Sequence, residues 1–252
     1  MTDKIARFRA LHIPGDPLIL VNIWDAGSAK AVAAAGAKAI ATGSFGVAGA
    51  QGRADGEDFP LEDVFANLTR ILSVTDLPVT IDMESGYGAD PAAVDVSVGR
   101  ARDAGAVGIN MEDRLPGQSD LLPIAEAVAR FRAAADTGIF VNARCDAFRG
   151  QDVAKDGDAL VAATLERARA YADAGAGSLF VPFLLDPRCI GAICDASPLP
   201  VNILRGKGGP THKQLAELGV ARISHGHQPW AGAMEWLSAQ AAQVFGGAEP
   251  DY

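Results

Sequence analysis

The residues best suited to chemistry are carboxylates that directly follow short apolar segments of the chain. Asp82 and Glu84 end one such segment, Glu112 and Asp113 end the next, and Asp25 ends the first. Because alternate residues of an extended chain share a face, Asp82 and Glu84 are expected to point the same way. Carboxylates gathered in a partly buried site repel one another, and a hard divalent cation relieves that repulsion. The pattern predicts a site for Mg²⁺, with Mn²⁺ as the alternative ion.

An arginine extends this acidic group. Arg144 follows another apolar segment, two residues before Asp146, and shares its face with Asn142. The planar guanidinium of arginine is suited to clamping a substrate carboxylate. Cys145 lies between Arg144 and Asp146, so its side chain should point to the opposite face of the strand. It is expected to be a buried, inert thiol. Carboxylates on neighbouring segments with an arginine among them favour a binding site for a small acidic molecule.

Some polar residues near these segments have a simpler interpretation. Acidic residues after strands often cap the next helix, and Asp90, Asp120 and Asp186 are expected to do so. His225 and His227 follow the last apolar segment, but two histidines so spaced in a loop indicate a metal or phosphate site only weakly. A hydrogen-bonded or exposed histidine is the favoured interpretation there. His12 and His212 are expected at the surface.

Short β-branched segments alternate with alanine-rich segments of helical period, the pattern of a parallel sheet built from βα units. Strands are expected at 18–24, 37–42, 78–83, 107–111, 139–143, 178–182, 201–204 and 221–224. Helices are expected near 2–11, 28–35, 60–74, 90–104, 120–135, 156–174, 186–196, 211–218 and 229–244. Several helix-to-strand joins carry a glycine that can end a helix in the left-handed conformation: Gly36, Gly105, Gly175 and Gly219.

Eight such units indicate an α/β fold, a single (βα)8 TIM-type barrel over residues 1–252 with an extra N-terminal helix. A doubly wound open sheet is the main alternative, but it would require a glycine-rich phosphate turn after the first strand, where the chain has Asp25-Ala26-Gly27-Ser28. Residues 44–59 are expected to form a long loop after the second strand. Active sites of barrels lie on that face, so the loop is expected to be functional.

The composition limits the classes of partner. A formal net charge of −9 excludes a nucleic-acid binder that depends on clustered basic residues. Three cysteines without a CxxC pair fit a reducing cytoplasm. No run approaches the ~18 apolar residues of a membrane helix, and the first residues lack a signal-peptide core. The chain is expected to be soluble and cytoplasmic, with a small molecule as its ligand.

Several of these motifs resemble those of the isocitrate lyase/phosphoenolpyruvate mutase superfamily. The acidic pair before Gly-Tyr-Gly, followed by Glu-Asp one strand later, is a fairly specific combination. The resemblance runs in order through nearly the whole chain, in the segments 22–29, 42–44, 52–55, 82–88, 108–113 and 142–146. It implies homo-oligomers, dimers or tetramers, with a C-terminal helix exchanged between subunits, here 229–244.

The resemblance also implies roles for individual residues. Asp82 would be the direct Mg²⁺ ligand, while Asp55, Glu84 and Glu112 would act mainly through metal-bound waters. The backbone amides of Ser44 and Phe45, together with Arg144 and Asp55, would bind a 2-oxo acid or its enolate. Arg144, Glu112 and Tyr87 are the expected catalytic residues.

Two departures from the family pattern narrow the expected activity. Glu84 stands where the family usually has aspartate. Lyases carry a Lys-x-Cys-Gly-His element after the fourth strand, where this chain has residues 114–120 without Cys, Lys or His. Isocitrate or methylisocitrate lyase activity is therefore not expected, and P–C bond chemistry is less expected than C–C chemistry.

The expected function is Mg²⁺-dependent C–C bond cleavage of a small 2-oxo acid such as oxaloacetate, by decarboxylation or hydrolysis through a metal-stabilised enolate. One alternative is a C–C lyase acting on a larger 2-hydroxy acid, with Tyr87 or His225 as proton donor. Another is a 2-oxo acid binding protein that has lost catalysis.

Overall fold

Nine parallel strands form the centre of the computed structural model, which describes residues 2–250. Their order is β1-β9-β8-β7-β6-β5-β4-β3-β2, so from β2 to β9 each strand pairs with the next one along the chain. The strands are β1 (Leu18–Leu20), β2 (Asn22–Ile23), β3 (Ile40–Thr42), β4 (Val79–Asp82), β5 (Gly108–Glu112), β6 (Phe140–Arg144), β7 (Ser178–Val181), β8 (Val201–Leu204) and β9 (Arg222–Ser224). The predicted TIM-type α/β barrel is confirmed.

The predicted first strand is divided in two at Val21. Its first part, β1, pairs with β9, and its second part, β2, pairs with β3, so this one segment nearly closes the barrel. Asn22 strengthens the closure. Its Nδ2 donates to the carbonyl of Thr42 at 2.8 Å, and its Oδ1 accepts from the amides of His225 and Gly226 at 3.0 and 2.8 Å.

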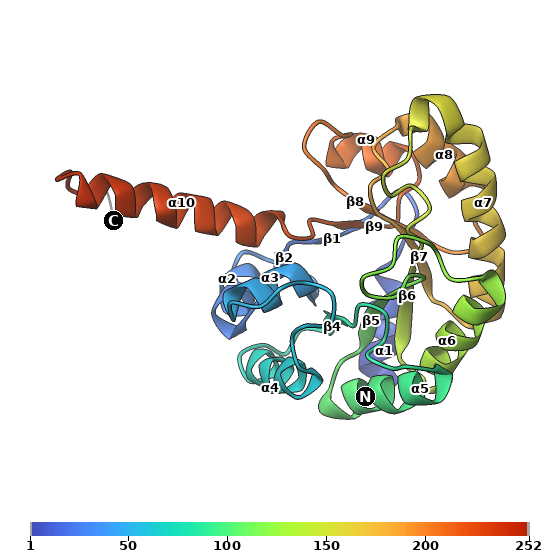
Figure 1. The fold of residues 1–252 in the computed structure, drawn as a ribbon, viewed down its shortest axis with the longest axis horizontal. Coiled ribbons are helices and arrows are strands. Elements are labelled where there is room, and N and C mark those ends of the chain that lie inside the picture. The colour runs from blue at the N-terminus through green and yellow to red at the C-terminus, as the bar shows by residue number, and fades with distance from the viewer. Residues whose placement is uncertain (1, 251–252) are drawn as a thin grey trace.

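Helices lie around the strands, except for the last helix, which points away from them (Figure 1). They are α1 (Thr2–Ala10), α2 (Ala26–Ala34), α3 (Ser44–Ala50), α4 (Leu61–Leu72), α5 (Pro91–Ala104), α6 (Ile124–Asp136), α7 (Val153–Asp173), α8 (Pro187–Ala196), α9 (His212–Glu217) and α10 (Gln228–Phe245). The four glycines predicted to end helices all have positive φ: Gly36 98°, Gly105 117°, Gly175 97° and Gly219 83°. These are conformations that side chains disfavour, so glycine is required where the chain turns from helix to strand.

Helix caps follow the sequence at most of the predicted positions. Asp90 accepts a hydrogen bond from the amide of Ala93, and Asp186 accepts one from the amide of Cys189. The expected cap at Asp120 is wrong, because α6 begins at Ile124 after Pro123. Proline at that point presets the entry into the helix without a side-chain cap.

The extra helix α1 packs at the opposite end of the barrel from the predicted site. Phe8 joins a second apolar cluster with residues of β1, β3 and β6 and with Val107, which directly precedes β5. His12, expected at the surface, is instead 6% exposed, with its ring 4.5 Å from that of Phe140. The error arose because α1 covers the barrel end, so a histidine just after it is buried by tertiary packing.

The predicted loop over 44–59 is wrong in its first half, which forms helix α3. Because glycine has a low helix propensity, Gly46 and Gly49 made a helix unexpected from the sequence. A Cβ on Gly49 would lie 2.7 Å from the ring of Trp230, and one on Gly46 would lie 3.1 Å from that side chain. Tertiary packing of α3 under the start of α10 therefore requires these small residues.

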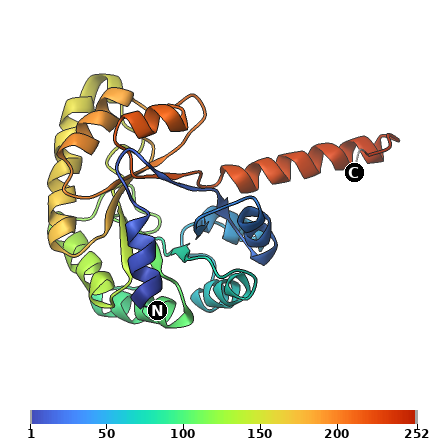
Figure 2. The ribbon, with the colours of Figure 1, turned by 180° about the vertical axis from the view of Figure 1, so that it is seen from behind.

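Helix α10 extends away from the barrel (Figures 1 and 2). None of its residues is buried, and Met234, Leu237 and Phe245 are 38%, 53% and 89% exposed. On the barrel, Ile19 and Val21 are 42% and 40% exposed. Among the described residues, no helix is both long and apolar enough to cross a membrane.

Candidate active site

Asp82 lies at the carboxyl end of β4 and is held by backbone contacts on both sides. Its amide donates to the hydroxyl of Thr42 at 2.9 Å. Its carboxylate accepts from the amide of Ser44 at 3.3 Å and from that of Glu84 at 3.2 Å. Burial, with the charge of Asp55, raises the pKa of Asp82, while Arg144 opposes the rise. One of the amides expected to bind substrate, that of Ser44, thus contacts Asp82 instead.

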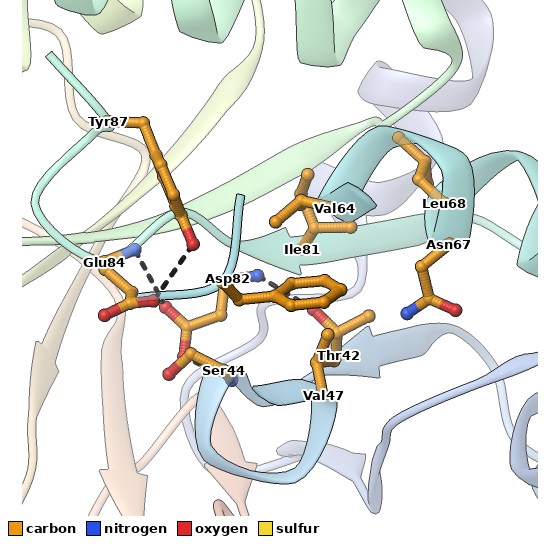
Figure 3. Close-up of a pocket in the computed structure, with 11 residues that line it drawn as sticks. Thr42, Ser44, Val47, Val64, Asn67, Leu68, Ile81, Asp82, Glu84 and Tyr87 are labelled. Atoms are coloured by element: carbon orange, nitrogen blue, oxygen red, sulfur yellow. Dashed lines mark hydrogen bonds between the residues drawn. The ribbon is translucent and has the colours of Figure 1, made fainter. Parts of the chain in front are cut away.

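Glu84 lies beyond the strand, in a turn of unusual backbone. Glu84 and Tyr87 have φ values of 48° and 50°, and Gly86 has 105°. The Tyr87 hydroxyl donates to Glu84 Oε1 at 3.1 Å, and both side chains line a small pocket beside Asp82 (Figure 3). Burial, followed by the charges of Asp82 and Asp55, raises the pKa of Glu84 to about 8. The expected closeness of Asp82 and Glu84 is confirmed, although it comes from a turn and not from strand parity.

Two residues that sequence reasoning missed hold this turn. Glu57 Oε1 accepts from the amide and hydroxyl of Ser85 at 3.0 and 2.6 Å and from the amide of Tyr87 at 3.1 Å. The amide of Glu57 donates to Glu84 Oε2 at 2.7 Å. From the other side, the buried Arg130 donates to the carbonyls of Ser85 and Gly88 at 2.9 and 2.8 Å. The loop that carries Asp55 is thereby fastened to the turn that follows Asp82.

Arg144 joins the acidic residues at the ends of β5 and β6. Its Nη1 lies 2.6 Å from Glu112 Oε2, and its Nε and Nη2 lie 2.6 and 2.9 Å from the two oxygens of Asp146. Burial raises the pKa of Glu112 to about 7, although Arg144 opposes the rise. A guanidinium has five N–H donors, so the two hydrogen bonds to Asp146 and the ion pair with Glu112 leave donors for a ligand. Glu112 and Arg144 are register partners in the β5–β6 pairing, so two strand-end residues predicted for the site lie side by side.

Two further arginines border the same space. Arg114, in the loop after β5, lies 3.3 Å from Asp146 and 3.9 Å from Glu112. Arg149 lies 3.5 Å from Asp146 and is about half exposed. In the sequence, the segment Arg114–Asp120 stands where lyases carry their Lys-x-Cys-Gly-His element. In the structure, the guanidinium of Arg114 occupies this position beside the site.

Two adjacent cavities open at this end of the barrel. One, of about 230 Å³, lies over the barrel interior and is lined by Asp82, Asn110, Phe45 and His227 among others. The second, of about 390 Å³, lies between the Asp55 loop and the loop after β5 and is lined by Glu84, Glu112 and Arg114 among others. Both are lined by Ser44, Asp55, Arg144 and Arg149. Tyr87 lines neither of these two cavities.

Other predicted candidates lie outside this group. Asp25 caps α2, with its Oδ1 2.7 Å from the amide of Ser28. Asp113 is buried, and its Oδ2 accepts from Tyr171 at 2.6 Å and from Arg167 at 3.2 Å. Cys145 is fully buried as predicted, and burial raises its pKa well above the usual value. Asp25 and Asp113 therefore hold the fold.

The two histidines after β9 also have contacts within the fold. His225 Nδ1 lies 2.9 Å from the carbonyl of Leu20, and its Nε2 lies 3.2 Å from that of His212. His212 was expected at the surface and is instead partly buried by this pair. His227 lies against Phe45, with ring centroids 5.4 Å apart.

The donor set fits a hard cation held mostly through water. Asp82, Glu84 and Glu112 offer only oxygen ligands, and burial raises the pKa of each. A divalent ion reverses such shifts because its charge stabilises carboxylates. Among the described residues, no group of three or more His, Cys, Asp or Glu lies close enough to hold a metal ion by itself. Oxygen ligands are those that Mg²⁺ prefers, and Mg²⁺ usually keeps several waters.

Comparisons with known proteins agree on one family. The phosphoenolpyruvate phosphomutase family model matches residues 8–245. A crystal structure described as a "putative phosphonomutase" from Burkholderia cenocepacia J2315 is 48% identical, with a TM-score of 0.93 over 96% of this chain and 99% of that one.

Two relatives with named activities are more distant. The 2-methylisocitrate lyase of Escherichia coli (strain K12) is 31% identical over 206 residues, which cover 77% of this chain and 67% of that protein. An oxaloacetate decarboxylase of Bradyrhizobium sp. (strain BTAi1) is 28% identical over 204 residues, 75% of this chain and 67% of that protein.

Proposed function

Since the chain belongs to the isocitrate lyase/phosphoenolpyruvate mutase superfamily of enzymes, we propose that it is a Mg²⁺-dependent enzyme that cleaves a C–C bond of a small 2-oxo dicarboxylate such as oxaloacetate. The observation that carries this proposal is the convergence of Asp82, Asp55, Glu112 and Arg144 on one pair of cavities. Decarboxylation is the favoured reaction and hydrolysis the alternative. The oxaloacetate decarboxylase among the relatives supports the substrate class.

Asp82 would hold Mg²⁺ directly, with Asp55, Glu84 and Glu112 binding its water ligands. The amides of Ser44 and Glu84 orient the Asp82 carboxylate and keep its position fixed. When bound, Mg²⁺ would supply an electron sink for the 2-oxo group of the substrate and stabilise the charge that develops there.

The arginines favour a substrate with two carboxylates. Arg144 is anchored by Glu112 and Asp146 and would bind the carboxylate next to the 2-oxo group with its remaining donors. Arg149 and Arg114 border the same space and would attract a second carboxylate. Three cations beside the acidic site offset the net negative charge of the chain for an incoming dianion.

Decarboxylation is consistent with a site that has no counterpart of the lyase cysteine. Loss of CO2 from oxaloacetate breaks the C3–C4 bond and leaves the electron pair on C3, in the enolate of pyruvate. A proton from solvent at C3 then completes pyruvate. No step requires the cysteine acid of the lyases, whose position is occupied by a loop with Arg114.

Product analysis distinguishes the reactions. Oxaloacetate should be incubated with the protein and Mg²⁺ and the products followed by NMR, with an enzyme-free sample containing the same Mg²⁺ as control. Decarboxylation predicts pyruvate, and hydrolysis predicts oxalate and acetate. If neither product exceeds the enzyme-free rate, the proposed reaction on oxaloacetate is wrong.

A second candidate function is P–C bond chemistry on a phosphonate of a 2-oxo acid. The 48%-identical crystal structure described as a "putative phosphonomutase" favours it. The same Asp82 and Arg144 would bind phosphonopyruvate. Parallel incubation with phosphonopyruvate tests this candidate: ³¹P NMR would show phosphoenolpyruvate or inorganic phosphate if it is correct and unchanged phosphonate if it is wrong.

We also propose that the protein is a homo-oligomer, a dimer or tetramer, in which α10 packs on a second copy. Leu237 and Phe245 expose apolar side chains on α10, while Ile19 and Val21 expose them on the outer face of the barrel. Figure 1 shows that α10 points away from its own barrel. An α10 from a second copy would cover both apolar surfaces at once.

A further inference from the structure

A buried arginine fills part of the barrel interior below the candidate site. Arg222, on β9, is 0% exposed, and its Nη2 donates to Asn110 Oδ1 at 3.0 Å. It lies within electrostatic range of Asp82 on one side and of His12 on the other. Its Nε and Nη1 have no hydrogen-bond partner among the described residues. A buried charge with unpartnered donors costs stability, so a gain in function is expected to offset it.

Arg222 fixes the direction of a buried hydrogen-bond chain. Asn110 Oδ1 also accepts from Asn142 Nδ2 at 2.8 Å, and Asn142 Oδ1 accepts from the Ser178 hydroxyl at 2.6 Å. Each amide or hydroxyl in this chain can be reversed, because it has both donors and acceptors. A guanidinium only donates. The atom of Asn110 that faces Arg222 must therefore be its oxygen, and this sets the orientation of the others.

The amide nitrogen of Asn110 is consequently left for the cavity. Asn110 lines the cavity of about 230 Å³ together with Asp82 and Arg144, and it is the register partner of Asp82 on the adjacent strand. Within residues 2–250 its Nδ2 forms no hydrogen bond, and it is not among the buried unpartnered atoms. Two N–H donors thus face the space beside the metal-binding carboxylate.

We infer that Asn110 donates a hydrogen bond to an oxygen of the bound 2-oxo acid, and that Arg222 is the positioning residue that orients its amide. This inference rests on the proposed function, since it concerns the ligand of that site. It also defines specificity. The position beside Asp82 requires an acceptor such as the 2-oxo oxygen, and a 2-amino acid that bound in the same orientation would present there an ammonium group that cannot accept.

The test uses the affinity for oxalate, measured by calorimetry on the full chain at saturating Mg²⁺. Asn110→Asp keeps an acceptor for Arg222 and Asn142, removes the amide donors and adds a negative charge. Arg222→Met removes the orienting cation and leaves the Asn110 amide itself unchanged. Arg222→Lys restores an obligate donor. Thr80→Val is the control, because Thr80 is buried on the same strand face as Asp82 and its hydroxyl has no described partner.

We expect oxalate to bind about tenfold more weakly to Arg222→Met, the loss typical of one hydrogen bond to a charged group. The loss in Asn110→Asp should be at least as large, because the added carboxylate also repels oxalate. Arg222→Lys should recover most of the affinity, and Thr80→Val should match the wild type. Mg²⁺ binding without oxalate should not weaken in Arg222→Met, because the lost charge repelled the cation. A merely structural role for Arg222 would weaken both.

Three results would overturn the inference. Oxalate affinity within twofold of wild type in both Asn110→Asp and Arg222→Met would overturn it while leaving the proposed function intact. Parallel loss of Mg²⁺ and oxalate binding in Arg222→Met would show general disruption instead of positioning. If the wild-type protein binds no oxalate with Mg²⁺, the proposed function is wrong and the inference falls with it.

Discussion

The carboxylate of Glu84 lies 2.7 Å from the backbone nitrogen of Glu57, a residue 27 positions earlier in the chain. The Glu84 oxygens accept from the amide of Glu57 and the hydroxyl of Tyr87, so Glu84 also contacts the loop that carries Asp55. Through the contact with Glu57, the Glu84 side chain reaches the loop that carries Asp55 and holds it. Glu84 therefore shapes the site through that loop.

Shortening Glu84 should release that loop. In Glu84→Asp the carboxylate withdraws from both partners, with a cost of about 1 kcal/mol for each hydrogen bond. We expect trypsin to cleave after the exposed Arg53 about tenfold or more faster than in wild type, measured by mass spectrometry. Glu62→Asp, a conservative change at an exposed site on α4, is the matched control. Equal cleavage rates in Glu84→Asp and wild type would show that Glu84 does not hold the loop.

Arg149 should bind the second carboxylate of the substrate. Arg149→Leu is expected to raise KM for oxaloacetate about tenfold, as for loss of a partly exposed charge-assisted hydrogen bond. The affinity for oxalate, which spans only the Arg144 end, should change much less. Steady-state kinetics measures KM for oxaloacetate, and calorimetry measures the affinity for oxalate. Arg188→Leu, at an exposed arginine of α8, serves as control. A proportional loss for both ligands would argue against a separate carboxylate position.

His12 should make stability depend on pH. Burial, with the charge of Arg222, lowers its pKa from 6.5 to about 3, so it stays neutral in the folded state while the unfolded chain takes up a proton. The contribution of His12 to the free energy of unfolding is complete above pH 6.5. It is lost as the pH falls toward 3, by up to about 1.4 kcal/mol per pH unit.

Denaturant unfolding of wild type and His12→Phe at several pH values measures this contribution. The free energy of unfolding of the wild type should fall more steeply below pH 6.5 than that of His12→Phe, which keeps the contacts with the rings of Phe8 and Phe140. Parallel curves for the two proteins would mean that His12 does not carry the effect.

The exposed side of α10 should set the oligomeric state. Leu237→Glu places a charge on the apolar surface proposed to contact a second copy, so the protein should dissociate to smaller species in light scattering. Gln240→Glu, on the same helix, adds a similar charge at a polar position and should leave the mass unchanged. A monomeric wild-type protein, or an unchanged mass of Leu237→Glu, would contradict the proposed contact.

The barrel could be predicted because its signals are local. Alternating apolar segments and glycines with positive φ at 36, 105, 175 and 219 each depend on neighbouring residues only. Helix α3 could not be predicted in this way, since Gly46 and Gly49 form a helix only against Trp230. The burial of His12 was missed for the same reason, because α1 closes the barrel end.

The site was predictable where strand ends supply the residues, as for Asp82, Glu112 and Arg144. Residues that contact the site from distant parts of the chain could not be recognised from their neighbours in the sequence. Glu57 binds Ser85 across 28 residues of chain, and Arg130 binds it across 45. Conversely, Asp25 and Asp113 fit the acidic pattern but cap a helix and hold a tyrosine, respectively. Residue type and position do not distinguish these uses.

The most direct test of the account is the Mg²⁺-dependent rate of pyruvate formation from oxaloacetate by the wild type and by Asp82→Asn, each corrected for the enzyme-free rate at the same Mg²⁺. Asparagine keeps the size of Asp82 and removes the charge that would hold the ion. The account predicts a Mg²⁺-dependent wild-type rate that falls to the enzyme-free level in Asp82→Asn, while circular dichroism shows that the variant is folded. Equal Mg²⁺-dependent rates in the two proteins would contradict a metal site built on Asp82.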